Sequence, residues 1–171
     1  MGRDPSDTPK LAEPLHYHDA PEHPRVAELV DYWNAKRGTR PMPDRADIVP
    51  GEIPRLLPNI VICEVLRGGE DFRMRIFGTK LVELTGEERT GKSLSDFGAH
   101  AIVPTRPEIV QDRWLEVIRR SYQQVKPVFV SGAMTSSDRP YLAWHAVSCP
   151  LTAGGTAVSQ LMGGLFVVDR R

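Results

Sequence analysis

The first clear pattern in the chain is a helical repeat of apolar residues after Pro24. These residues fall at positions i, i+3, i+4 and i+7 of an otherwise charged stretch, which is typical of an amphipathic helix. Proline is well tolerated at the first position of a helix, and Gly38 is suited to end it. Such a stripe must pack either on the body of the domain or on a second subunit, and the pattern leaves both open. The stripe consists of Val26, Leu29, Val30 and Trp33.

A strand pattern follows farther along the chain. Residues 59–66 (NIVICEVL) are apolar and rich in β-branched side chains, and residues 67–71 contain the paired glycines of a turn. Residues 72–77 (FRMRIF) alternate between apolar and charged, so we expect an antiparallel hairpin whose second strand is half buried. The residues expected on the buried face of that strand are Phe72, Met74 and Ile76.

The rest of the chain adds helices and three more strands. A short helix is expected over residues 80–85, ending at Gly86, and the longest helix is expected to run to about Gln124. Short turns within both groups of strands predict an α+β fold, in which one antiparallel sheet carries helices on one face and an extra N-terminal helix is added. The three apolar segments expected to be the last strands are residues 128–134, 141–149 and 160–168.

Composition divides the chain into three parts. Residues 1–22 are polar and proline-rich without periodicity, so we expect a disordered or draped arm. Residues 23–58 hold the N-terminal helix and a proline-rich connector, in which Arg40, Arg45 and Asp47 are expected to be surface or loop-fixing groups rather than catalysts. Residues 59–169 are expected to form the main domain, with no output domain attached.

Charge and composition argue against several classes of protein. The 22 lysines and arginines balance 22 aspartates and glutamates without forming a basic stripe, so we expect no nucleic-acid partner. No apolar run approaches the roughly 18 residues that a membrane helix needs, and no secretory signal is expected. The two cysteines, Cys63 and Cys149, stand in apolar runs, which predicts buried, reduced thiols in a cytoplasmic protein.

One motif suggests a nucleotide site. Residues 86–93 (GEERTGKS) match the G-x-x-x-x-G-K-S pattern of a phosphate-binding loop. Such a loop must leave a parallel strand and enter a helix, so that backbone N–H groups and the helix dipole hold phosphate. Here a short helix is expected before the motif, and Glu87 and Glu88 would place negative charge beside the phosphate. A nucleotide-binding protein that uses Gly86 to Ser93 is therefore only a second alternative.

The residues with catalytic or metal-binding chemistry do not form a recognisable site. The chain has no Gly-x-Ser-x-Gly elbow, and no pair of carboxylates stands at an informative spacing. His16, His18 and His23 have no cysteine or carboxylate at a matching ligand spacing, and His145 has no recognisable nucleophile partner. We therefore expect no enzyme activity, no catalytic residue and no metal.

The order of several short motifs resembles the PAS domain, and most of all small bacterial single-domain PAS proteins. The likeness covers roughly residues 25–168. The motifs that carry it are Tyr32-Trp33, Arg37-Gly38, Met42-Pro43-Asp44-Arg45, Asp47-Ile48, Leu57-Pro58, Phe72-Arg73-Met74-Arg75, Gly78-Thr79, Leu84-Thr85-Gly86 and Thr90-Gly91-Lys92-Ser93-Leu94.

The resemblance implies a fold and a cavity. The sheet would have five antiparallel strands in the order 2-1-5-4-3, and helices on one face would enclose a cavity that holds a ligand or only side chains. The two cysteines would lie on strands 1 and 4 with strand 5 between them, which is too far apart for a disulfide. The candidates to line the cavity, for each of which a place in the plain core is the stronger explanation, are Met74, Ile76, Leu81, Trp114, Trp144 and Met162.

The resemblance also bears on cofactors. Haem-binding relatives coordinate the iron through a histidine of the long helix, and residues 106–124 contain no histidine. His145 on a predicted strand is still a possible axial ligand. Covalent flavin photochemistry needs an Asn-Cys-Arg-Phe motif, which the chain lacks. The sequence thus argues against both cofactors and identifies no other, while non-covalent flavin stays open.

The resulting expectation is a stand-alone sensory or regulatory domain without catalysis. It would bind a small molecule or a protein partner, form a homodimer, and act on a separate signalling protein. The stripe of the N-terminal helix would serve as a dimer or cap surface. The alternative is a purely structural interaction module whose cavity is filled with side chains.

Overall fold

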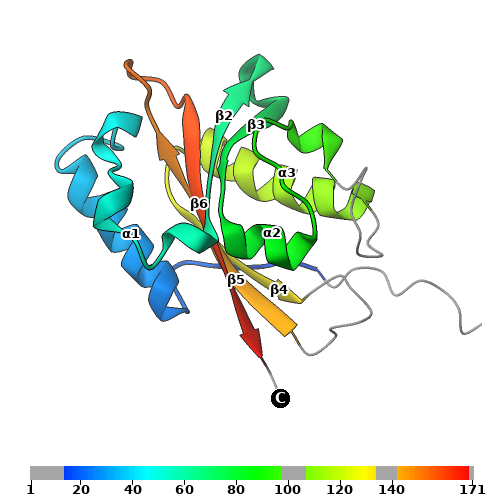
Figure 1. Ribbon diagram of the computed structural model, residues 1–171. Helices are drawn as coiled ribbons and strands as arrows, with labels where there is room; N and C mark the ends of the chain where they lie inside the picture. Colours follow the sequence, from blue (N-terminus) through cyan, green and yellow to red (C-terminus); the bar gives the residue numbers. More distant parts are fainter. Residues whose placement is uncertain (1–13, 98–106, 134–141, 170–171) are drawn as a thin grey trace, which may run out of the picture.

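A single antiparallel sheet forms the centre of the protein, as the computed structural model shows for residues 14–97, 107–133 and 142–169 (Figure 1). Its strand order is β1-β4-β5-β6-β2-β3. The two longest strands, β5 and β6, lie side by side near its middle and pair over their whole length. The strands are β1 (His16–His18), β2 (Ile60–Leu66), β3 (Asp71–Phe77), β4 (Val128–Ala133), β5 (Leu142–Leu151) and β6 (Gln160–Asp169).

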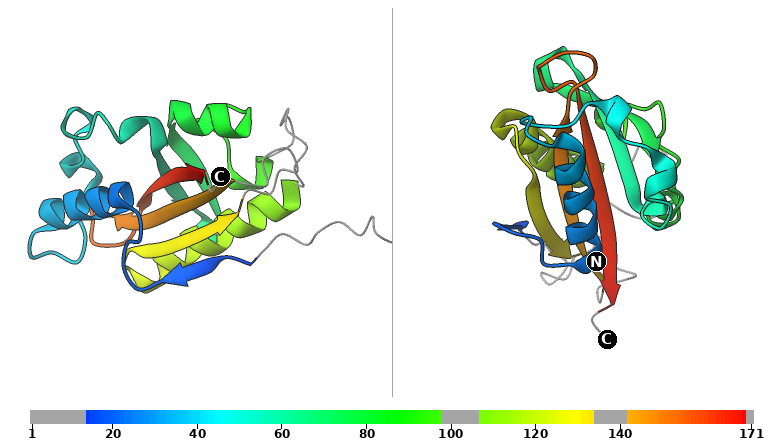
Figure 2. Two further views of the ribbon diagram at one scale, coloured as in Figure 1. Left: turned by 90° about the horizontal axis from the view of Figure 1, so that it is seen from below. Right: turned by 90° about the vertical axis from the view of Figure 1, so that its left-hand side faces the viewer.

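Helices cover both faces of this sheet (Figure 2). Helix α1 (Pro24–Arg37) packs across β5 and β6 on one face, here called the outer face. Helices α2 (Thr79–Thr85) and α3 (Pro107–Gln124), with the turn η5 (Leu94–Asp96), cover the opposite, inner face. The extra N-terminal helix, which the sequence could not place, is therefore separated from the other helices by the sheet. No helix in these described ranges is long and apolar enough to cross a membrane.

The sheet has one strand more than the five that the sequence predicts. The order β3-β2-β6-β5-β4 is the expected 2-1-5-4-3, but β1 extends the sheet at the free edge of β4. Tyr17 pairs with Val130, its hydroxyl donates to Glu116 at 2.7 Å, and the Arg120 guanidinium lies 3.6 Å from its ring. The part of the predicted arm that is described is thus ordered by pairing and by contacts with α3, while residues 1–13 lie outside the described residues.

A β-bulge changes which side chains of β3 face inward. Ile62 pairs with Ile76 and Cys63 with Met74, so Arg75 is an extra residue opposite a single step of β2. Such an insertion reverses the alternation of side chains beyond it. Met74 therefore packs on the inner face, whereas Ile76 packs on the outer face. The expectation that Phe72, Met74 and Ile76 share one face is wrong for Ile76.

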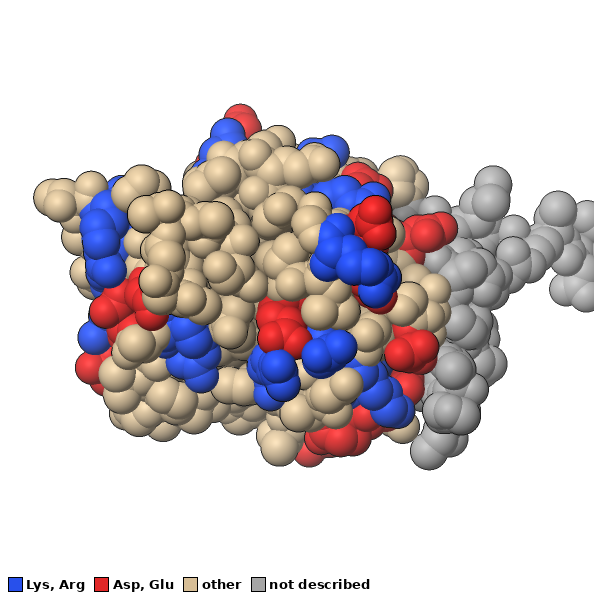
Figure 3. Space-filling model, turned by 90° about the horizontal axis from the view of Figure 1, so that it is seen from above, with Lys and Arg blue, Asp and Glu red and all other residues tan. Residues whose placement is uncertain are grey.

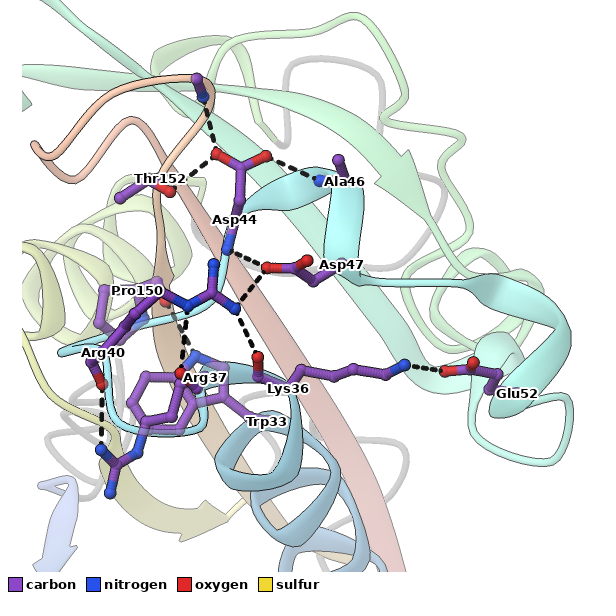
Figure 4. Close-up of polar contacts among 11 residues, drawn as sticks. Trp33, Lys36, Arg37, Arg40, Asp44, Ala46, Asp47, Glu52, Pro150 and Thr152 are labelled. Atoms are coloured by element: carbon purple, nitrogen blue, oxygen red, sulfur yellow. Dashed lines mark hydrogen bonds and ion pairs between the residues drawn. The ribbon is translucent and has the colours of Figure 1, made fainter.

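The apolar stripe of α1 is buried against the sheet of its own chain. Its four residues are 0–6% exposed and share a core cluster with residues of β2, β5 and β6. Trp33 also donates its indole N–H to the Pro150 carbonyl at 2.9 Å (Figure 4). Of the two possibilities that the sequence left open, the structure shows packing on the body of the domain.

A polar network fixes the connector to the turn between β5 and β6 (Figure 4). The Asp44 carboxylate accepts hydrogen bonds from the Ala46 and Gly154 amides and from the Thr152 hydroxyl, and these bonds lower its pKa. Asp47 accepts from the Asp44 amide at 2.8 Å and from Arg40 at 2.8 Å. The expected loop-fixing role of Arg40 and Asp47 is confirmed.

We expect the Gly78→Ala variant to lose about 2 kcal/mol of unfolding free energy, because the entry to α2 has no room for a methyl group. A Cβ at Gly78 would overlap the Pro58 carbonyl and lie 2.7 Å from the Leu57 carbonyl oxygen, and backbone atoms cannot move aside as side chains do. Urea denaturation measures the loss. Gly51→Ala is the control, since a Cβ there meets nothing within 4 Å; equal stability of the two variants would contradict the close packing at Gly78.

Candidate functional site

An apolar cavity of about 50 Å³ lies between the inner face of the sheet and the helices above it. Strands β2, β3, β5 and β6 form its floor, and α2 and α3 contribute its roof. Hydrocarbon and aromatic side chains make most of its surface. Representative lining residues are Met74, Leu81, Phe97, Trp114, Leu161 and Leu165.

The structure sorts the six sequence-predicted cavity residues into two groups. Met74, Leu81 and Trp114 line the cavity. Trp144 belongs to the same inner layer and stacks on Trp114 with ring centroids 5.8 Å apart. Ile76 and Met162 instead pack on the outer face, in the cluster that contains α1. Ile76 is displaced by the bulge, and Met162 lies in a continuous apolar run in which the sequence does not reveal the face of each residue.

Two adjacent glycines of β6 serve opposite faces of the sheet. A Cβ at Gly163 would lie 2.9 Å from Val61 Cγ1 and 3.1 Å from the Val147 carbonyl oxygen, on the cavity side. A Cβ at Gly164 would lie 2.8 Å from Leu29 Cδ2, on the α1 side. Gly163 therefore keeps the floor of the cavity open, and Gly164 lets α1 approach the sheet closely.

Arg89 places a buried positive charge at the wall of the cavity. Its side chain is 4% exposed, and its guanidinium carbon lies 4.2 Å from the ring centroid of Phe97 and 5.6 Å from that of Phe77. Burial lowers the pKa of Arg89, while the nearby Glu87 carboxylate opposes this shift. Among the described residues that line the cavity, Arg89 is the only one with a formal charge.

Glu87 holds this cation in place from within the same loop. Its carboxylate is 3% exposed and lies 3.4 Å from Arg89 Nε and 3.1 Å from Lys92 Nζ. Sequence reasoning missed Arg89 and Glu87, because a charged run between glycines is normally a solvated loop. No local signal distinguished them, since their burial depends on Phe77 and Phe97 from other parts of the chain.

A second polar group faces the cavity from the sheet. Ser148 lies on the inner side of β5, is 4% exposed, and lines the cavity. Its hydroxyl is buried without a hydrogen-bond partner in the structure. Buried hydroxyls are satisfied in the large majority of cases, so this one has room for a polar partner from the cavity, either a water molecule or a ligand atom.

The phosphate-loop motif does not have the required geometry. It begins at Gly86, the left-handed C-cap of α2, and it leads into a single 3-10 turn rather than a helix. The Gly91 amide donates to the Met74 carbonyl at 2.7 Å, and the Lys92 amide donates to Arg89. These N–H groups are thus engaged within the chain, and Lys92 pairs with Glu87.

His18, His23 and His145 do not line the cavity. His145 projects from the outer face, and its ring centroid lies 5.7 Å from that of His23 and 6.2 Å from that of His18. Because the inner cavity is on the opposite side of the sheet, His145 is not placed to ligate a haem there. Within the part of the chain that the structure describes, no group of three His, Cys, Asp or Glu side chains is arranged to hold a metal ion.

We expect both cysteines of the native protein to resist thiol reagents at pH 8. Burial raises the pKa of Cys63 to about 12 and raises that of Cys149 as well, so very little reactive thiolate forms. Both are free, as predicted, with β6 between their strands. A colorimetric thiol assay should detect almost no reaction within minutes, and two equivalents in denaturant. Rapid native labelling of Cys63, which lines the cavity, would show that the cavity opens readily.

Comparison with known proteins agrees with this architecture. No curated protein matches the chain. The family model described as the PAS domain matches residues 21–166, which include α1 and nearly all of the sheet. PAS domains are sensory and signalling modules, generally without catalysis of their own. The match covers most of the sequence, and the chain therefore belongs to the PAS domain family.

Proposed function

We propose that this protein is a non-catalytic sensory domain that binds a small molecule in its inner cavity. The observation that carries the proposal is the cavity itself, which combines apolar walls with a buried cation, Arg89, and an unpaired hydroxyl, Ser148. Small-molecule sites typically have apolar linings with a few placed polar groups.

Occupancy of the cavity would bias the positions of the elements around it. Leu81 of α2, Trp114 of α3 and Phe97 beside η5 each contribute to its wall, so a ligand touches three elements in addition to the sheet. A ligand shifts a conformational equilibrium only if it binds one arrangement more tightly than another. We propose that a separate signalling protein, contacted by a homodimer in the cytoplasm, responds to that shift.

The experiment is a search for the ligand with a blocked cavity as reference. Native mass spectrometry of the purified protein and thermal shift measurements with small organic probes report binding. Val117→Phe places a ring in the cavity and should abolish binding while the domain stays folded, because Val117 is a buried lining residue on α3. Val167→Phe adds the same ring at an exposed position of β6 and should leave binding unchanged.

The size of the cavity favours one alternative, a structural interaction module. Sites for drug-sized ligands measure roughly 300–1,000 Å³, well above the cavity of about 50 Å³. If no probe binds the wild-type protein, and if Val117→Phe raises stability by filling empty space, the cavity is only a packing defect and the structural module is the correct function.

A further inference from the structure

Two cations share one buried carboxylate at the cavity wall. The Glu87 carboxylate pairs with both Arg89 and Lys92, and the exposed Glu88 carboxylate also acts on Lys92. Lys92 is 37% exposed, whereas Arg89 is 4% exposed. The buried cation, which has only a share of one carboxylate, is therefore the one that lines the cavity.

The contact between the Arg89 guanidinium and the Glu87 carboxylate is long for an ion pair. Its Nε lies 3.4 Å from Glu87 Oε2, whereas charge-assisted hydrogen bonds of this kind are usually about 2.7–2.9 Å. A guanidinium carries five N–H donors in a planar fork that fits a carboxylate. The rings of Phe77 and Phe97 hold this fork in place without using its donors.

We propose that the ligand is a small monocarboxylate, whose carboxylate pairs with Arg89. This inference rests on the proposed function and names its ligand class. The apolar walls formed by Met74, Leu81 and Trp114 take the short hydrocarbon part. A cavity of about 50 Å³ has room for roughly three to five water-sized groups, which limits the ligand to acids of about three or four carbons.

The test compares acids with neutral and cationic molecules of the same shape. Propionate and butyrate, their amides, and propylamine are titrated into the full chain by calorimetry near pH 7, and binding is checked by thermal shift. We expect both carboxylates to bind at least ten-fold more tightly than the amides, and the amine not to bind. Trp114 in the cavity wall adds a fluorescence signal for occupancy.

Variants assign the recognition to particular side chains. Arg89→Met should weaken carboxylate binding at least ten-fold. If this variant fails to fold, the double variant Glu87→Leu with Arg89→Met replaces it, because it removes the same cation together with its buried partner. The double variant should weaken binding to the same extent. Lys80→Met removes the same charge from an exposed pair with Glu83 and should alter binding less than two-fold. Ser148→Ala should raise the melting temperature, because it removes an unsatisfied buried hydroxyl.

The outcomes separate this inference from the function on which it depends. Equal binding of butyrate and butyramide in the cavity would overturn the carboxylate proposal and leave a small-molecule sensor. Carboxylate binding that persists in the double variant would place the acid elsewhere and also overturn it. If no probe binds, and native mass spectrometry finds no other ligand, both the proposed ligand class and the proposed function are wrong.

Discussion

Glu87→Gln is expected to lower the free energy of unfolding by about 3–5 kcal/mol, the usual effect of removing one partner of a buried ion pair. The carboxylate is 3% exposed, and its loss would leave the Arg89 guanidinium buried without a counterion. Glutamine keeps the shape of the side chain, so the effect isolates the charge. Urea denaturation followed by circular dichroism gives the free energy of each variant.

Two controls determine whether the ion pair is the cause. Glu83→Gln removes a carboxylate from the nearby pair with Lys80, in which both side chains are more than 60% exposed, and should change stability by less than about 0.5 kcal/mol. Glu87→Leu combined with Arg89→Met should recover most of the loss, since apolar residues often replace a buried ion pair without penalty. An effect of Glu87→Gln as small as that of Glu83→Gln would mean that water reaches the pair.

The sequence predicted the elements of this fold well, because their signals are local. The stripe of α1 repeats with helical spacing, and the strands β2 and β3 are joined by a Gly-Gly turn. The order of the motifs then identified the family, which supplied the sheet topology. Strand β1 was missed because three polar residues carry no strand pattern, and they are ordered by the free edge of β4 and by contacts of Tyr17 with α3.

The candidate site was predicted only in part, for three physical reasons. The bulge opposite Cys63 depends on hydrogen bonding between strands, so the sequence of β3 alone could not show that Ile76 turns outward. A residue in a run that is apolar throughout, such as Met162, has no polar neighbours to reveal its face. The burial of Arg89 arises from aromatic rings that lie on either side of it in the chain, and charge in a loop suggests the opposite.

The sheet separates the cavity from the N-terminal helix. Its inner face carries the cavity, and its outer face carries α1. Gly163 and Gly164 are consecutive in β6, yet a Cβ on Gly163 would meet Val61 on the cavity side and a Cβ on Gly164 would meet Leu29 of α1. Under the proposed function, a ligand that moved β6 would therefore also move the surface on which α1 packs. A signalling partner would then detect occupancy on the outer face.

Trp33→Ala is expected to destabilise the domain by about 3–5 kcal/mol, because it removes a buried aromatic ring from the contact between α1 and the sheet. Trp33 is 3% exposed, and its loss also leaves the Pro150 carbonyl without its indole donor. Chemical denaturation measures the change, and analytical centrifugation measures the oligomeric state of the same samples.

The control for this variant is Asp31→Ala on the exposed side of α1, which should change stability by less than about 0.5 kcal/mol. The two measurements distinguish a helix that caps its own sheet from one that joins two subunits. If α1 only caps the sheet of its own chain, Trp33→Ala should lower the unfolding free energy at every protein concentration. If α1 instead joins two subunits, the Trp33→Ala variant should dissociate into stable monomers. That result would contradict the packing of Trp33 against Pro150 of its own chain and would require α1 to be shared between subunits.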